Sequence, residues 1–339
     1  MAQDTHDIVE YWQSIQSILR GYRQAQVLIS ATQLGVFRAL SGGPLSASDL
    51  AVRIDTEPSA LLRLLNAAVA MKLLVQDGEN YANAPLAAAC LAQEEGRFYL
   101  GNLVTREGAF YRRWSHLSLA VRSGKQPEAN VRDEDNVLWA REFELALLDL
   151  ARAAGPAFAE VLPVPAERPA RVLDVGGGHG GYSMALARRY PNVEATVFEL
   201  PAAAEVAREL IAEEGMDDRV VVHVGDFQQE ALGSDYDLVL LFGVLGSESA
   251  EGKVALLRKA HDALAAGGAV AIRGFADDEQ PDGLDDALFS LHLLLSTAAG
   301  DSPTLDELKQ GLVEAGFIHP RLIQLPEWIG STLLVAEKG

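Results

Sequence analysis

The chain has little of what disulfide-stabilised, nucleic-acid-binding or membrane-spanning proteins need. Its single cysteine, Cys90, excludes an internal disulfide, and its apolar neighbours predict a buried, inert thiol. Only 28 lysines and arginines stand against 48 acids, a balance that disfavours nucleic acid and anionic membranes, because phosphate binding needs clustered cations. No apolar run reaches the roughly 18 residues of a membrane span, and the N-terminus is too polar for a secretory signal. We therefore expect a cytoplasmic protein with neither nucleic acid nor membrane as a partner.

What the chain does have is a glycine-rich segment, 171–181, with the sequence RVLDVGGGHGG. A predicted buried strand (171–175) enters it and a predicted helix (182–190) follows it, a turn that brings a ligand close to the backbone. Its glycines satisfy the dinucleotide pattern G-x-G-x-x-G, which is weak by itself. Asp174, at the end of the strand, points instead to Asp-x-Gly-x-Gly-x-Gly, typical of S-adenosylmethionine (SAM) methyltransferases. This carboxylate is expected to accept hydrogen bonds from a ligand ammonium or from loop amides, and a structural turn without ligand is the alternative.

From residue 171 onward, predicted strands and helices alternate, which is typical of a doubly wound α/β sheet with parallel strands. The predicted strands are 171–175, 194–198, 219–224, 237–242, 268–273, 320–325 and 331–336. Only Pro326–Gly330 separates the last two strands, which is too short for a helical crossover and predicts that they are antiparallel neighbours. A Pro-rich linker at 163–169 precedes the glycine segment, so we predict two domains, 1–160 and 161–339.

The first 160 residues predict a mostly helical domain. Residues 8–40 show helical periodicity, with apolar residues from Ile15 to Ile29 on one face. Two short helices, Ser46–Ile54 and Pro58–Lys72, precede a hairpin, and together they predict a winged helix, which usually binds DNA. Residues 46–79 carry only three basic side chains against five acids, so packing or dimerisation is the favoured role.

Two further segments predict an adenosine site. Glu199 ends the second predicted strand, where an acid can accept hydrogen bonds from both ribose hydroxyls. In the turn Gly225–Phe227, Asp226 can accept from an adenine amino group and Phe227 can stack on the ring. The alternatives are a solvated acid at Glu199 and a simple turn with a core phenylalanine.

These segments resemble the two-domain SAM-dependent methyltransferases of the caffeate, hydroxyindole and bacterial polyketide type. The matching pieces are Leu34–Phe37, Asp49–Ala51, Leu61–Leu65, Asp174–Gly180, Glu199–Pro201, Asp218–Val220, Gly225–Phe227 and Ala315–Phe317. The resemblance implies a class I methyltransferase domain after a winged-helix dimerisation domain, a homodimer, SAM as cofactor and S-adenosylhomocysteine (SAH) as product. The cofactor-binding residues that we predict are Asp174, Gly176, Gly178, Gly180, Glu199, Leu200, Asp226, Phe227, Phe242 and Gly243.

The chain departs from this family where O-methyltransferases place a histidine base after the fourth strand. Gly246 stands there, and glycine cannot accept a proton. A phenol has a pKa of about 10, and a positioned base is worth about 10²–10⁴ in rate. We therefore favour an acceptor with no proton to lose, such as a thioether, a neutral amine or a preformed carbanion. Proximity and alignment then supply the catalysis.

The family activity that fits best is the S-methyltransferase of dimethylsulfoniopropionate synthesis, whose acceptor is the thioether of 4-methylthio-2-hydroxybutyrate. An O- or C-methyltransferase with His292 or Glu248 as the base is one alternative. Without a catalytic role, His292 would be a hydrogen-bonded core histidine and Glu248 a solvated acid. A member of the family that binds SAM but does not transfer its methyl group is another.

Several residues are candidates for the acceptor pocket. The locally basic segment 106–125 contributes Arg113 and Trp114, and the end of the fifth strand contributes Arg273, unless Asp277 or Asp278 pairs with it at the surface. The remaining candidates are Phe143, Leu147 and His292. Cations in such a pocket favour a carboxylate-bearing acceptor. His179 is expected to face the cofactor, His116 is undecided, and the histidine spacing predicts no metal site.

Overall fold

The computed structural model describes residues 2–94, 96–130, 136–275, 283–298 and 301–339. Its contacts divide the chain into two compact units, Met1–Ala109 and Phe110–Gly339. The sequence instead predicts a boundary at 160/161, after the long helix that precedes the Pro-rich linker. The contacts group this helix with the second unit because it packs on helices of that unit. Within the described ranges, no helix is both long and apolar enough to cross a bilayer.

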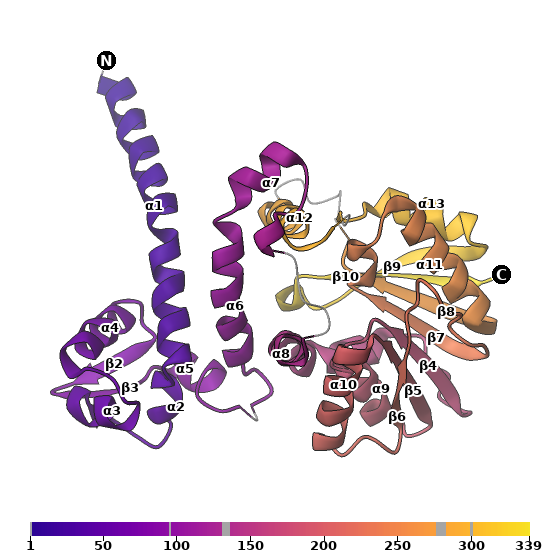
Figure 1. The fold of residues 1–339 in the computed structure, drawn as a ribbon, viewed down its shortest axis with the longest axis horizontal. Coiled ribbons are helices and arrows are strands. Elements are labelled where there is room, and N and C mark those ends of the chain that lie inside the picture. Colours follow the sequence, from indigo (N-terminus) through magenta and orange to yellow (C-terminus); the bar gives the residue numbers. More distant parts are fainter. Residues whose placement is uncertain (1, 95, 131–135, 276–282, 299–300) are drawn as a thin grey trace. The chain divides into compact units, whose positions relative to one another are not determined.

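The first unit contains the predicted helix pair and hairpin (Figure 1). Its elements are α1 (Ala2–Gln33), α2 (Val36–Ala39), β1 (Leu45–Ser46), α3 (Ala47–Arg53), α4 (Pro58–Ala70), β2 (Leu74–Asp77), β3 (Asn80–Asn83) and α5 (Pro85–Cys90). Ser46 caps α3 by accepting from the Asp49 amide, and Glu57 caps α4, which opens with Pro58. The hairpin closes through Gly78 at φ 59°, and the strands follow the order β1-β3-β2.

The core of this unit is small and apolar, with Phe37, Leu50, Leu65 and Tyr81 among its most buried side chains. Cys90 packs against this core but is only half-buried, so the expectation of a buried thiol was wrong. It is the last residue of a six-residue helix, where less of the chain is available to cover it.

The apolar face predicted along α1 is buried at one end only. Ile29 is 4% exposed, whereas Ile15 and Ile18 are 60% and 80% exposed. The N-terminal half of α1 therefore presents a row of apolar side chains that nothing in the first unit covers.

The second unit is built on a seven-stranded sheet. Its strands are β4 (Ala170–Val175), β5 (Val193–Glu199), β6 (Val220–Val224), β7 (Tyr236–Phe242), β8 (Leu264–Arg273), β9 (Phe317–Gln324) and β10 (Thr332–Lys338). All seven predicted strands are confirmed, with bounds shifted by a few residues. The order is β6-β5-β4-β7-β8-β10-β9, with the first five parallel. β10 is antiparallel to both β8 and β9, as the short connection predicts.

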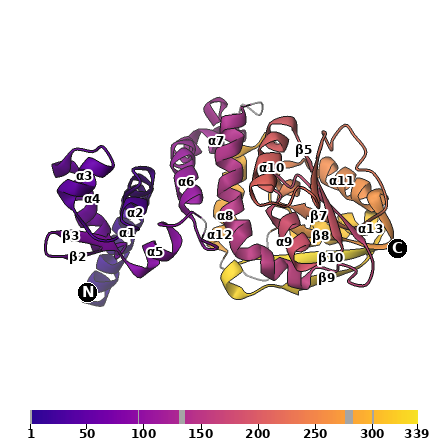
Figure 2. The ribbon, with the colours of Figure 1, turned by 90° about the horizontal axis from the view of Figure 1, so that it is seen from below.

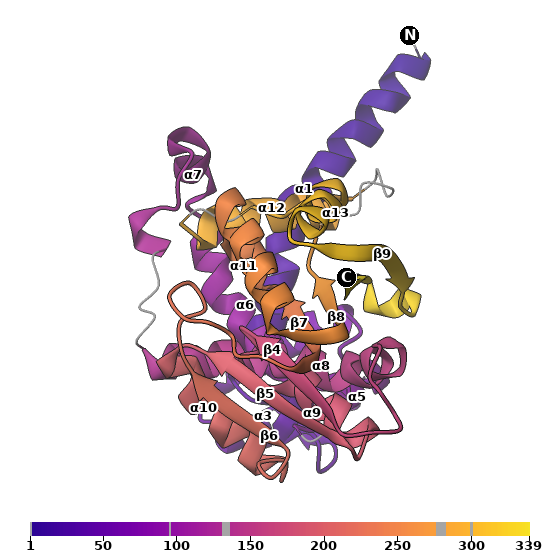
Figure 3. The same cartoon turned by 90° about the vertical axis from the view of Figure 1, so that its right-hand side faces the viewer.

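Helices cover both faces of this sheet (Figures 2 and 3). The helices in the second unit, which do not all lie on the sheet, are α6 (Gly101–Trp114, which begins in the first unit), α7 (Leu117–Ser123), α8 (Val137–Val161), α9 (Gly181–Arg189), α10 (Pro201–Glu213), α11 (Ala250–Ala263), α12 (Leu284–Ser296) and α13 (Leu305–Glu314). Three short 3-10 turns are η1 (Glu128–Asn130), η2 (Val244–Ser247) and η3 (Glu327–Ile329). One core joins α8, α9 and α10 to the sheet, and a second core joins α11 and α13 to its other face. From β4 the chain adds β5 and β6 on one side and then β7 and β8 on the other. The gap between β4 and β7 is therefore the point where the strand order reverses, at which such sheets bind ligands.

Candidate active site

The loop after β4 exposes backbone where a ligand could approach. Gly176, Gly178 and Gly180 all have positive φ, at 64°, 46° and 66°, which L side chains rarely adopt. A Cβ at Gly178 would lie 2.1 Å from Oε2 of Glu144, so a side chain fits there only if the Glu144 carboxylate or the loop moves. These glycines are therefore required by backbone conformation and by close packing, and the loop leads directly into the N-terminus of α9.

Asp174 lies beneath this loop rather than on its surface. It is 1% exposed, and its Oδ2 accepts from the Ser183 hydroxyl at 2.8 Å. The sequence suggested a bond from a ligand ammonium or from loop amides, whereas the structure shows a hydroxyl on α9 as the donor. Burial raises the pKa of Asp174 to about 7, and the charge of Glu199 adds to this rise. Asp174 therefore joins the end of β4 to α9.

This burial predicts a pH-dependent stability effect of Asp174→Asn. The ordinary pKa of Asp174 is 3.8, so between about pH 4 and pH 7 the folded protein keeps a proton that the unfolded chain releases. The carboxylate thus removes stability as pH rises through this window. In urea unfolding without cofactor, the free energy of unfolding of the variant should exceed that of wild type by up to roughly 4 kcal/mol at pH 8. At pH 5 the difference should be smaller. His179, whose pKa burial lowers to about 3, is present in both proteins and cancels. An equal gap at both pH values would contradict the expectation.

Glu199 stands at the end of β5, beside the glycine loop. Its Oε2 accepts from the Gly178 amide at 3.1 Å and its Oε1 accepts from the Leu200 amide at 2.8 Å. Burial raises the pKa of Glu199, and these two amides act against that rise. Each carboxylate oxygen has a second lone-pair direction, so the side chain can still accept from ligand hydroxyls. Leu200, the next residue, is exposed beside it.

The predicted adenine turn lies at the end of the neighbouring strand, β6. Asp226 and Phe227 are both half-buried, and Phe227 packs against the core on the α11 side. The Gly225 amide donates to the Glu199 carbonyl at 3.0 Å, which ties this turn to the end of β5. The ends of β4, β5 and β6 thus bring together the residues that the sequence predicts for SAM.

The end of β7 completes this edge of the sheet. Phe242 packs edge-on against Tyr182 with ring centroids 5.0 Å apart, so its half-buried ring lies against the core. Gly243 follows in the left-handed region, and its amide donates to the Arg273 carbonyl. Gly246 is buried in η2, and a Cβ there would meet Leu293 of α12 at 3.5 Å, an ordinary contact. A longer side chain at position 246 would therefore face α12.

Comparison with known proteins identifies this arrangement. Residues 164–318 match the model of the O-methyltransferase domain, and residues 16–93 match that of the O-methyltransferase dimerisation domain. Acetylserotonin O-methyltransferase from Bos taurus is 30% identical over 332 residues, covering 91% of this chain and 93% of the relative. The chain belongs to the two-domain SAM-dependent O-methyltransferase family.

The methyltransferase also has relatives that act on a different kind of atom. The N,N-dimethyltransferase OxyT from Streptomyces rimosus is 29% identical, and the match covers 96% of each chain. Among solved structures, PigF with SAH superposes with a TM-score of 0.84 at 27% identity, over 96% of this chain and 99% of PigF. The protein is thus a SAM-dependent methyltransferase for small molecules, and relatives with similar chains differ in the atom that they methylate.

In the methyltransferase, Arg113 and His292 meet around the ring of Phe110. The His292 ring lies edge-on to Phe110 at 4.5 Å, and the Arg113 guanidinium lies 5.6 Å from the same ring and 5.9 Å from that of Trp139. Nη1 of Arg113 is buried with no hydrogen-bond partner among the described residues, and burial lowers the pKa of Arg113. A buried guanidinium nitrogen in this state is a strong site for an anion.

Buried Asn130 holds the elements that carry this cluster together. Its Nδ2 donates to the carbonyls of Arg113 at the end of α6 and of Leu295 in the last turn of α12. Its Oδ1 lies 2.8 Å from Nδ1 of His116, which gives that histidine a structural contact. Trp114, next to Arg113, is half-buried.

The other predicted acceptor residues divide between this cluster and other places. Phe143 stacks on Trp139 at 5.0 Å, and Leu147 follows one turn later on the same face of α8. Arg273 makes its hydrogen bonds elsewhere, since it donates to the Tyr182 hydroxyl at 2.7 Å and to the Ser331 hydroxyl at 3.2 Å. Asp277 and Asp278, its alternative partners, lie outside the described residues.

Three polar residues near the site are buried. The His179 ring is buried, and its Nδ1 accepts from the Gly181 amide at 2.8 Å. Glu248 is buried rather than solvated, and both of its oxygens lie 3.2 Å from Nε2 of Gln228. Glu144 was missed, although it is 6% exposed and packs on Gly178. An acid within the apolar run of α8 was the available signal.

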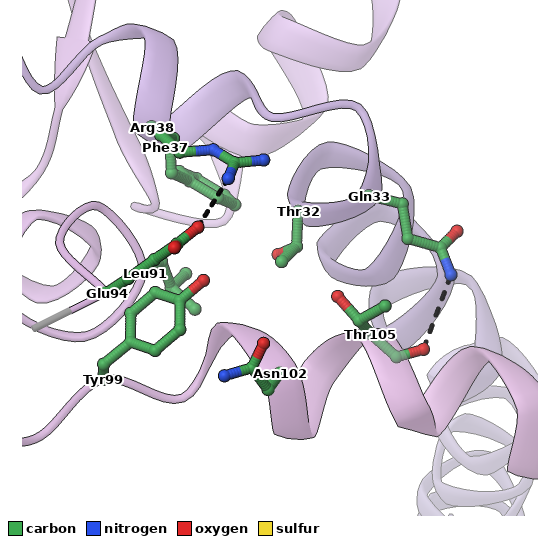
Figure 4. Close-up of a pocket in the computed structure, with 9 residues that line it drawn as sticks. All are labelled: Thr32, Gln33, Phe37, Arg38, Leu91, Glu94, Tyr99, Asn102 and Thr105. Atoms are coloured by element: carbon green, nitrogen blue, oxygen red, sulfur yellow. Dashed lines mark hydrogen bonds and ion pairs between the residues drawn. The ribbon is translucent and has the colours of Figure 1, made fainter. Parts of the chain in front are cut away.

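Two further observations concern the rest of the molecule. Among the described residues, no three His, Cys, Asp or Glu side chains gather as a metal ion requires. The first unit contains a cavity of about 250 Å³, in which Arg38 pairs with Glu94 at 2.5 Å (Figure 4). It is lined by Thr32, Gln33, Phe37, Arg38, Leu91, Glu94, Tyr99, Asn102 and Thr105, none of which is a predicted site residue.

Proposed function

We propose that the methyltransferase acts on a small carboxylate-bearing acceptor whose nucleophilic atom has a lone pair and no proton to lose. The leading candidate is the thioether sulfur of 4-methylthio-2-hydroxybutyrate. A neutral amine is the second candidate, favoured by the similarity to the N,N-dimethyltransferase OxyT. SAM supplies a methyl group carried on a sulfonium.

The observation that carries this proposal is the packing of Gly246. A Cβ at Gly246 would point at Leu293 of α12, so the position after β7 where the family places its base faces an apolar side chain. His292 is the neighbour of Leu293, and its ring contacts Phe110 instead. Glu248 is engaged by Gln228. These contacts support transfer by proximity and alignment rather than by a base.

Arg113 supports the choice of a carboxylate. Its buried Nη1 and its two aromatic neighbours form a site for a planar anion, and Arg pairs with carboxylates in a bidentate way. In this proposal Glu199 binds the ribose of SAM, Asp226 and Phe227 bind adenine, and the glycine loop lies along the methionine part. α8 then spans both ligands, because Phe143 faces the acceptor while Glu144 touches Gly178.

The proposal is tested with methyl-labelled SAM and three acceptors that share a carboxylate and differ in nucleophile. These are 4-methylthio-2-hydroxybutyrate, 4-(dimethylamino)benzoate, whose aryl amine is neutral near pH 7, and 4-hydroxybenzoate. We expect label in the first or second, at a rate that does not follow the ionisation of a protein base, and little in the phenol. His292→Ala should keep this activity. Preferred labelling of the phenol, lost in His292→Ala with the pH profile of a missing base, would establish the base-dependent alternative. No transfer to any acceptor would favour a member of the family that binds SAM without methylating.

We also propose that the methyltransferase is a homodimer formed through α1. The match to a dimerisation domain supports this, and the exposed row at Ile15 and Ile18 is the apolar surface that a second copy would cover.

The double substitution Ile15→Asp and Ile18→Asp should convert a dimer into a 36.4 kDa monomer, because it places charges inside the proposed interface. Size-exclusion chromatography with light scattering measures this mass. Val52→Asp, which changes an apolar side chain that is 84% exposed on α3, should leave the dimer intact. A wild-type monomer at micromolar concentration would refute the proposal.

A further inference from the structure

The turn that follows β6 is organised around one ammonium group from another element. Lys259, on α11, donates through Nζ to the carbonyls of Phe227 at 2.6 Å, Gln228 at 3.1 Å and Glu230 at 2.9 Å. An ammonium has three N–H donors, and all three are directed at this one turn. Three carbonyl dipoles converge on one point, an arrangement that is unfavourable without a cation to receive them.

The remaining bonds of the turn fix its side chains. Oδ1 of Asp226 accepts from the Gln228 amide at 2.8 Å, and Oε1 of Glu230 accepts from the Asp226 amide at 3.0 Å. Gln228 is in turn held by buried Glu248. Lys259 binds the backbone carbonyls of Phe227, Gln228 and Glu230 in the same turn. The orientations of Asp226 and Phe227 thus depend on a backbone path that the ammonium group stabilises.

We propose that Lys259 is a positioning residue for adenine recognition. It holds the carbonyls on both sides of Gln228, so that the Asp226 carboxylate and the Phe227 ring keep the geometry that adenine needs. The inference rests on the proposed assignment of these two residues to adenine. Lys259 itself touches neither cofactor nor acceptor in this account, and its effect passes through the turn.

The role of Lys259 can be separated from general stability because Asp226 reads one group of the base. SAH carries the adenine 6-amino group, from which Asp226 is proposed to accept. S-inosylhomocysteine carries an oxygen there and a proton on the neighbouring N1, and is otherwise the same molecule. A correctly held Asp226 favours SAH over this analogue, whereas a turn that has relaxed loses the preference while the glycine loop and Glu199 still bind both.

The experiment is calorimetric titration of both compounds into wild type, Lys259→Met and Lys253→Met. Lys253 is the matched control, because it lies on the same helix and its Nζ donates to the single carbonyl of Asp301, at 2.9 Å. We expect Lys259→Met to bind SAH at least tenfold more weakly and the inosine analogue less than threefold more weakly. Lys253→Met should match wild type.

Two results would overturn the inference. One is SAH affinity in Lys259→Met within twofold of wild type. The other is an equal loss of affinity for both compounds, which would show a purely structural role. Retained binding of the inosine analogue by Lys259→Met demonstrates that the variant is folded. If wild type binds neither compound, the cofactor assignment fails and the role of Lys259 fails with it. If wild type binds both equally, the cofactor assignment stands and adenine reading by Asp226 is refuted.

Discussion

Gly178→Ala is expected to abolish SAH binding in a protein that still folds. The residue has φ 46°, where a Cβ is strained, and that Cβ would lie 2.1 Å from a carboxylate oxygen of Glu144. Glu144 is buried on α8, so either its carboxylate must turn away or the loop must shift, and the positive φ strains the loop in both cases. We expect the strained loop to move the Gly178 amide away from Glu199, the acid proposed to hold the ribose. We expect affinity for SAH to fall more than 100-fold by calorimetric titration.

The matched control is Gly215→Ala. Gly215 has a similar φ of 63° at the end of α10, and a Cβ there would meet no atom within 4 Å. This substitution therefore adds the backbone strain, worth about 1–2 kcal/mol, without the clash. It should lower the free energy of unfolding by that amount and leave SAH affinity unchanged. If Gly178→Ala bound SAH within threefold of wild type, the loop would not be the cofactor site proposed here.

Arg113→Met is expected to raise the KM for the carboxylate acceptor that the labelling panel identifies by about 100-fold, as the loss of a charge-assisted pair implies. Methionine keeps an apolar side chain between Phe110 and Trp139, so the aromatic packing remains. SAH affinity should stay within twofold of wild type, because the glycine loop and Glu199 are untouched. Steady-state kinetics and SAH titration on the same preparation measure the two effects separately.

Arg112→Met is the matched control, since Arg112 is the exposed neighbour on the same helix. It should change neither constant. A methyl ester of the acceptor supplies an independent check, because it lacks the negative charge. Replacing the acid by the ester should raise the KM of wild type much more than it raises the KM of Arg113→Met. Equal use of acid and ester by wild type would exclude Arg113 as a carboxylate site.

The sheet was predictable because its signals are local. Each strand is a short apolar run next to a turn, and the five-residue segment between the last two strands left no room for a crossover helix. The glycine loop was predictable for the same reason, since its residues are contiguous and their backbone requirement is written in the glycines. Glu199 and Asp226 followed from their positions at strand ends.

The cluster proposed to bind the acceptor was only partly predictable because distant elements assemble it. Arg113 comes from α6, Trp139 from α8 and His292 from α12, and Asn130, which joins two of these helices, carries no sequence signal for that role. Burial was equally hidden. Glu248 turns inward to Gln228, and Arg273 is engaged by Tyr182 and Ser331, which are distant in sequence.

The two faces of α8 have a consequence for how acceptor preference can diverge. Trp139, Phe143 and Leu147 recur at every fourth residue, while Glu144 and Ala151 lie against the glycine loop. Substitutions on the first face can reshape the surroundings of the acceptor in the proposed site without altering the residues that press on the loop. In the proposed site, one helix can thus keep the cofactor-binding residues constant while the residues around the acceptor change. This is compatible with relatives of similar length that methylate oxygen in one case and nitrogen in another.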